Sequence, residues 1–255
     1  MTPTRTCALV AIAACAAGKP PPPKGTVAER PDNFVSLTDV EPTILVELRY
    51  FGTHNFMGRR VLGYKAEKCL LTKPAALALK GVQEDLRPFG LGLKAYDCYR
   101  PQRAVDTFVA WAKDMGDTKM QAEFYPRVPK ERIFREGYLL ERSGHSRGST
   151  IDLTVVPLPP PAQEQFHEGD PLRDCGMPAA QRFGDDSLDF GTGYDCFDAL
   201  ANVDNAGVNI DQKTKRIMLR ALMEKHGFKF YAPEWWHFTL RDEPYPETFF
   251  DFEIE

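Results

Sequence analysis

The segment TIDLTVV at residues 150–156 is the strongest constraint on the fold, because apolar and polar residues alternate along it. A period of two residues is that of a β-strand, whose successive side chains point to opposite faces of a sheet. One face is therefore predicted to belong to the core, through Ile151, Leu153 and Val155. The other face carries the carboxylate of Asp152 and is available for chemistry.

Segments of helical periodicity alternate with further strand-like segments along the chain. Apolar residues three and four positions apart predict helices at residues 72–86, 101–115 and 212–226. Aromatic and β-branched residues predict strands at residues 93–99 and on both sides of Pro233 within residues 228–240. This order predicts an α+β fold, with helices packed on a central antiparallel sheet.

The ends of these helices carry their own signals. Thr72 is placed to cap the first helix with its side chain, and Pro101 suits the first turn of the second. His226 ends the third helix, where an imidazole is expected to contact the terminal carbonyl groups. The apolar stripes of the second and third helices include Met115 and Ile217.

Length and composition favour one globular domain at residues 34–255. The chain has 255 residues, of which 43% are hydrophobic, so it is long enough to bury a substantial core. Its 32 basic and 36 acidic residues are spread along the sequence and give a net charge of -4. No basic block interleaved with aromatic residues follows a nucleic-acid backbone, so the sequence predicts no nucleic-acid partner.

The N-terminus is typical of an exported protein. One positive charge at Arg5 precedes a short apolar run at residues 8–14, and Cys15 follows in the order Ile-Ala-Ala-Cys, similar to a bacterial lipoprotein signal. Residues 1–15 are thus predicted to be an export signal with a lipid anchor at Cys15, and residues 16–33 a proline-rich tether. We expect a periplasmic protein or a lipoprotein anchored in the cell envelope. A signal cut after an alanine, or a cytoplasmic protein with an apolar N-terminus, are the alternatives.

Four cysteines lie beyond this signal: Cys69, Cys98, Cys175 and Cys196. An even number in an oxidising compartment favours disulfides, and the absence of a CxxC pair argues against a cysteine-bound zinc. Four cysteines allow three connectivities, among which we favour Cys69 with Cys98 and Cys175 with Cys196.

Residues 157–194 form a long segment rich in proline, glycine and aspartate. A loop of this length inside a compact domain is more often functional or disordered than idle. His167 lies in this polar segment and is expected to be solvated.

His145 and Asp152 lie seven residues apart across a turn that leads into the first strand described above. Imidazole and carboxylate are both good zinc ligands, and a catalytic zinc ion usually takes three protein ligands. His237 is the best third ligand, and Glu234 in the same segment, EWWH, is placed to act as a general base. The neighbouring tryptophans, Trp235 and Trp236, would wall the site. The alternative is a solvated carboxylate and structural histidines at a turn.

The segment SGHSRGSTIDLT at residues 143–154 resembles the S-x-H-x-x-G-x-x-x-D signature of the D-Ala-D-Ala metallopeptidases, a clan that includes the hedgehog fold. EWWHFTLRDEPYP and YDCYRP resemble the narrower family of D-alanyl-D-alanine dipeptidases, including those of vancomycin resistance. The resemblance runs from about Pro42 to the C-terminus. It implies a hedgehog-like, DD-peptidase-like fold for residues 34–255.

The same resemblance implies a catalytic apparatus. His145, Asp152 and His237 look like the ligands of one zinc ion per chain, and Glu234 looks like the base that activates water. Arg100 matches the arginine that stabilises the oxyanion of the tetrahedral intermediate.

Residues that bind the substrate are implied by the same resemblance. Asp195 falls on the family position that pairs with the substrate ammonium group, and Ser143 and Tyr50 match positions that contact the substrate. Asp97 matches an acidic residue that holds the arginine, and a disulfide at Cys98 would brace that loop.

The sequence therefore predicts a zinc dipeptidase that hydrolyses the free dipeptide D-Ala-D-Ala in the cell envelope. Two alternatives stay open from the sequence. One is a D,D-carboxypeptidase or murein endopeptidase acting on peptidoglycan stem peptides, and the other is a catalytically silent, zinc-containing binding lipoprotein.

Overall fold

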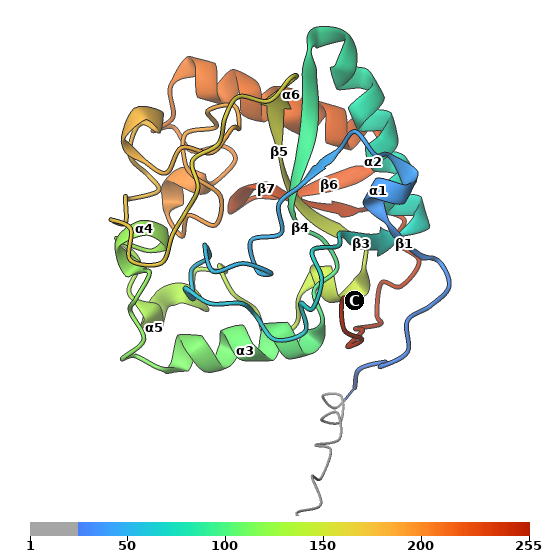
Figure 1. Cartoon of the computed structure of the whole chain (residues 1–255), viewed down its shortest axis with the longest axis horizontal. Helices are drawn as coiled ribbons and strands as arrows, with labels where there is room; N and C mark the ends of the chain where they lie inside the picture. Colours follow the sequence, from blue (N-terminus) through green and yellow to red (C-terminus); the bar gives the residue numbers. More distant parts are fainter. Residues whose placement is uncertain (1–24) are drawn as a thin grey trace, which may run out of the picture.

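The structure is a computed structural model that describes residues 25–255, shown in Figure 1. The predicted export signal at residues 1–15, Cys15 included, lies outside the described residues, as does the first part of the predicted tether. Within residues 25–33, Val27 lies beside the C-terminal segment. Its N–H donates to the carbonyl of Phe249 at 2.9 Å, and its carbonyl accepts from the N–H of Asp251 at 2.8 Å.

A five-stranded sheet forms the centre of the molecule, in the order β2-β4-β5-β7-β6. Neighbouring strands are antiparallel except for β2, which runs parallel to β4. Its strands are β2 (Leu45–Val46), β4 (Leu91–Asp97), β5 (Thr150–Pro157), β6 (Phe228–Tyr231) and β7 (Glu234–Leu240). A separate antiparallel pair is formed by β1 (Phe34–Ser36) and β3 (Leu70–Thr72). The predicted α+β class is confirmed, with a sheet that is mostly antiparallel.

The three longest helices of the described residues occupy the predicted segments. They are α2 (Lys73–Leu86), α3 (Gln102–Lys113) and α6 (Ile210–Lys225). The shorter helices are α1 (Leu37–Val40), α4 (Gln121–Phe124) and α5 (Lys130–Ile133). In Figure 1, α6 runs along the top of the view and α2 down its right side, whereas α3 and α5 lie at the bottom and α4 lies at the left. No helix among residues 25–255 is long and apolar enough to cross a membrane.

Strand β5 is buried on both faces. Ile151, Leu153 and Val155 are at most 1% exposed, as the alternating pattern predicts. The opposite face is covered as well, because the long segment after β5 folds back over it. Lys94, the register partner of Thr154, forms a buried ion pair with Asp186 of that segment. The face predicted to carry chemistry is thus enclosed, which keeps bulk water from its polar groups.

Two predicted helix-end contacts are wrong, because tertiary partners replace them. Thr72 precedes α2 but makes no capping bond with its side chain, whose hydroxyl instead shares a hydrogen bond with Ser149 at 2.6 Å. The ring of His226 turns away from the carbonyls of α6 and contacts Asp85 of α2, with 2.6 Å between Nε2 and Oδ2.

Two residues of the predicted apolar stripes are exposed. Met115 is 49% exposed, because α3 ends at Lys113 and the chain turns away from the core. Ile217 is 58% exposed, since it lies two residues before the buried Leu219 and therefore points to the other side of α6. His167 is exposed, as expected.

Both favoured disulfides are confirmed: Cys69 is joined to Cys98, and Cys175 to Cys196. The first links the end of β4 to the chain just before β3. The second links the long segment after β5 to the residues that directly follow Asp195.

Candidate active site

Register between three strands brings the principal polar side chains together. Asp97 at the end of β4 pairs with Asp152 of β5, after a β-bulge that follows Ala95, and Asp152 pairs with His237 of β7. Side chains at paired positions lie on the same face of a sheet. The three residues therefore form a row across the sheet, although they are far apart in sequence.

His145 reaches this row from the short 3₁₀ turn, Gly144–Arg147, that precedes β5. The turn closes at Gly148, whose φ of 83° belongs to the left-handed region. A Cβ at this position would lie 2.2 Å from Cζ of Phe34, so the chain requires glycine here. Gly148 thereby sets the position of His145 relative to β5.

His145, Asp152 and His237 direct one ligand atom each at a common point, and these atoms lie within 4.8 Å of one another. Nε2 of His145 is 3.3 Å from Oδ1 of Asp152, and Nδ1 of His237 is 3.0 Å from the same oxygen. That oxygen is buried and has no hydrogen-bond partner. Two imidazoles around a buried carboxylate oxygen are a donor set that fits a divalent metal ion such as zinc.

His145 is oriented by a contact outside this cluster, and His237 by the carboxylates beside it. Nδ1 of His145 lies 2.7 Å from the carbonyl oxygen of Cys98, and because a carbonyl only accepts, Nδ1 carries the proton and Nε2 is free to bind a metal. Burial opposes protonation of His237, but Asp152 and Glu234 together raise its pKa to about 9. The excess of negative charge here favours a bound cation.

Glu234 lies at the start of β7, with Oε2 at 3.3 Å from Nδ1 of His237. Its carboxylate borders the cavity beside the three candidate ligands and is not part of the cluster of ligand atoms. A carboxylate in this place can exchange a proton with a water molecule or an amine near the metal position.

Arg100 is buried next to the ligand cluster. Its Nε donates to Oδ2 of Asp97 at 2.8 Å, and Tyr64 donates to the other oxygen of Asp97 at 2.6 Å. The guanidinium lies 4.9 Å from the ring centre of Tyr50, and one of its nitrogens is 3.5 Å from Oδ2 of Asp152. Asp97 thus fixes a permanent positive charge at the edge of the site.

Asp195 faces the same cavity from the long segment after β5. Tyr50 donates to its Oδ2 at 2.7 Å. Burial raises the pKa of Asp195 well above its usual value, and the nearby charge of Asp152 raises it further. A cationic group in the cavity would offset this cost of ionising Asp195. Ser143 also lines the cavity, and its hydroxyl accepts from the N–H of His145 at 3.3 Å.

All of the predicted site residues except Asp97 line one cavity of about 250 Å³. Asp97 lies behind Arg100. The rest of the lining includes apolar and aromatic side chains, among them Phe56, Val105, Phe108, Tyr138, Leu139, Leu140, Phe197 and Tyr231. A cavity of this size suits a small ligand with several polar groups.

The two tryptophans do not wall the site as predicted. Trp235 stacks on Phe190 with 4.3 Å between ring centres, and Trp236 packs edge-on against Tyr194 at 5.5 Å. Neither tryptophan lines the cavity, because both are drawn into the core behind it.

Sequence reasoning missed Tyr194, whose hydroxyl donates to Oδ2 of Asp152 at 3.1 Å. This bond satisfies one carboxylate oxygen and leaves Oδ1 directed at the two histidines. The signal that could have indicated Tyr194 is its position directly before Asp195 in the sequence. Tyr64, which holds Asp97, was missed as well, since nothing in its local sequence indicates that contact.

Comparison with known proteins agrees with this geometry. The sequence model of a peptidase family described as D-ala-D-ala dipeptidase matches residues 30–158 and 184–255. The chain belongs to this family of hydrolases, whose members are zinc metallopeptidases.

Three relatives are each named D-alanyl-D-alanine dipeptidase. That of Streptomyces coelicolor is 36% identical over 222 residues, which covers 87% of this chain and 98% of the relative. That of Enterococcus faecalis is 33% identical over 223 residues, or 88% of this chain and 98% of the relative. That of Escherichia coli is 29% identical over 207 residues, or 81% and 84%.

The hydrogen bond from Tyr194 predicts an effect on metal affinity. Tyr194→Phe removes the partner of Oδ2 in Asp152, and we expect zinc to bind about 10- to 100-fold more weakly, as for other groups that orient a ligand. Competition with a chromophoric chelator measures this affinity. Tyr125→Phe, at a buried tyrosine that does not line the cavity and whose hydroxyl contacts none of the candidate ligands, is the matched control. Equal zinc affinity in the two variants would contradict the role given to Tyr194.

Proposed function

We propose that this chain hydrolyses the free dipeptide D-Ala-D-Ala to two molecules of D-alanine, with one zinc ion held by His145, Asp152 and His237. The observation that carries the proposal is the unpartnered Oδ1 of Asp152, which faces two histidine nitrogens in a small cavity. Family membership and the names of the relatives support the substrate and the reaction.

A zinc ion held by these three residues would supply a Lewis acid and would make the attacking water more acidic. Glu234 takes the proton of the attacking water and returns it to the amine that leaves. Arg100 donates hydrogen bonds to the oxygen of the substrate carbonyl as it gains negative charge. One preorganised donor of this kind contributes roughly 3–4 kcal/mol to the stability of a transition state.

Different groups contact different parts of the dipeptide. Asp195 and Tyr50 accept hydrogen bonds from the ammonium group of the substrate, and Ser143 contacts the substrate near His145. An N-acylated peptide would place a neutral amide against Asp195 and leave its buried carboxylate without a cationic partner. The enzyme therefore discriminates against stem peptides, in which the amine is already acylated.

Initial rates on free and on N-acetylated D-Ala-D-Ala test this assignment, and we expect cleavage of the free dipeptide alone. A chelator should abolish the activity, and added zinc should restore it. Comparable rates on both substrates would replace the dipeptidase with a D,D-carboxypeptidase or murein endopeptidase. Zinc binding without turnover of either substrate would instead indicate a binding protein.

Proton transfer by Glu234 predicts a separation of activity from metal binding. Glu234→Gln keeps the shape of the side chain but removes the base, so we expect kcat to fall by about 10²- to 10⁴-fold while zinc still binds. His145→Ala should lower the zinc content itself. Metal analysis beside steady-state kinetics distinguishes the two variants. Near-normal kcat in Glu234→Gln would exclude Glu234 as the base.

We also propose that the protein is exported and anchored by a lipid on Cys15, through the signal at residues 1–15 and the tether at residues 16–33. The two disulfides support an oxidising compartment. Cys15→Ser should move the protein from the detergent phase to the aqueous phase in phase partitioning of bacterial cells that express it. If wild type and variant partition alike, Cys15 carries no lipid.

A further inference from the structure

Residues 159–183 are the part of the chain after β5 that the family model does not match. This insertion carries Cys175, whose disulfide partner Cys196 lies in the matched part, directly after Asp195. A segment additional to the family pattern is therefore covalently joined to the residue next to a proposed substrate contact.

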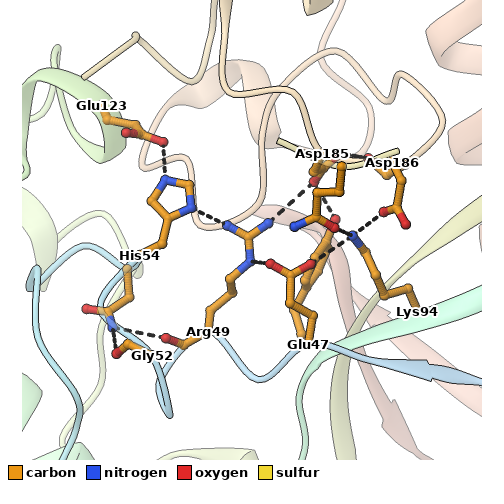
Figure 2. Close-up of polar contacts among 12 residues, drawn as sticks. Glu47, Arg49, Gly52, His54, Lys94, Glu123, Asp185 and Asp186 are labelled. Carbon is orange, nitrogen blue, oxygen red and sulfur yellow. Dashed lines mark hydrogen bonds and ion pairs between the residues drawn. The ribbon is translucent and has the colours of Figure 1, made fainter. Parts of the chain in front are cut away.

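The insertion is held on the body of the protein through His54. Phe166 stacks on the imidazole with 4.3 Å between ring centres, and Phe183 packs against it at 4.1 Å. Figure 2 shows the polar contacts of this ring: Arg49 donates to Nδ1 at 2.8 Å, and Nε2 donates to Glu123 at 2.7 Å. Burial lowers the pKa of His54, so the ring stays neutral in this chain of contacts.

Helix α4 continues this chain of contacts to the disulfide. The N–H of Cys175 donates to the carbonyl of Glu123 at 3.0 Å, and the N–H of Phe197 donates to the carbonyl of Phe124 at 2.7 Å. The N–H of Gly193 donates to the carbonyl of Cys175 at 2.8 Å. The turn at residues 193–197 is thus bound to the insertion at its start, through Gly193, and to α4 at its end, through Phe197.

Asp195 lies in the middle of this turn. Among residues 25–255 it is the one residue other than glycine with a positive φ, at 56°. A residue that carries a side chain keeps such a backbone conformation only where the surrounding contacts impose it. The contacts that act on the backbone around Asp195 include the disulfide of Cys196 and the bonds of Gly193 and Phe197.

We propose that the Cys175–Cys196 disulfide positions Asp195, so that the preference of the enzyme for a free substrate amine depends on the insertion at residues 159–183. Without the disulfide the turn loses its covalent link to the insertion, and the backbone bonds of Gly193 and Phe197, together with the hydrogen bond from Tyr50 to the carboxylate, are left to hold Asp195 in place. This inference rests on the proposed dipeptidase function. Both cysteines are positioning residues, since neither lines the cavity.

The other disulfide provides an internal comparison. Cys98 lies between Asp97 and Arg100, and its carbonyl accepts from Nδ1 of His145. Loss of the Cys69–Cys98 bond should therefore alter kcat and zinc affinity, whereas loss of the Cys175–Cys196 bond should alter the binding of the substrate amine.

The test is a double-mutant cycle between the disulfide and Asp195. Cys175→Ala/Cys196→Ala is prepared with Asp195 intact and in an Asp195→Asn background. With Asp195 intact, we expect KM for free D-Ala-D-Ala to rise by about tenfold, with kcat and zinc content little changed. The preference over the N-acetylated dipeptide should fall by a similar factor. In the Asp195→Asn background, removal of the disulfide should have no further effect on KM.

Two outcomes would overturn the proposal. One is an unchanged preference for the free amine in the disulfide variant. The other is a rise in KM on removal of the disulfide that is equally large in the Asp195→Asn background, as a purely structural disulfide would give. If wild-type protein does not cleave the free dipeptide at all, the proposed function fails, which is a separate result.

A second variant covers the case in which the protein without the disulfide does not fold. Phe166→Ala loosens the insertion but keeps both cysteines, and Phe89→Ala is the control at an exposed phenylalanine. We expect Phe166→Ala to raise KM for the free dipeptide with little change in kcat, and Phe89→Ala to change neither. A fall in kcat with unchanged KM in Phe166→Ala would contradict the role of the insertion.

Discussion

The buried carboxylate of Asp152 is the group on which the rest of the site depends. Burial opposes its ionisation, but His145 and His237 hold its pKa well below the usual range. Tyr194 binds one of its oxygens, and the other faces the two histidines without a hydrogen-bond partner. A buried charge of this kind is stable only where partners surround it, so the strands and turns that supply these partners must all be in place.

The long segment after β5 supplies partners both to the polar face of the sheet and to the site. It covers the polar face of the sheet, where Lys94 pairs with Asp186, and it brings Tyr194 and Asp195 to the site. The enclosure lowers the effective dielectric around the site, which strengthens each interaction between charges there. The segment that carries no regular strand or long helix thus contributes directly to the chemistry.

Local pattern was sufficient for much of the fold. The period of β5, the three longest helices and the two strands around Pro233 follow from the spacing of apolar and aromatic residues. Helix ends were less predictable, because Thr72 and His226 found partners in other elements, at Ser149 and Asp85. A local capping preference is worth about 1 kcal/mol, and a tertiary hydrogen bond of similar strength can replace it.

The sequence by itself determined the identities of the candidate ligands and of the base, because His145, Asp152, Glu234 and His237 fall in short segments of distinctive spacing. Tertiary structure alone decided which of their atoms meet, since strand register and the turn at Gly148 set those positions. It also decided the supporting contacts of Tyr64 and Tyr194. These bonds join residues tens of positions apart, and no local period records them.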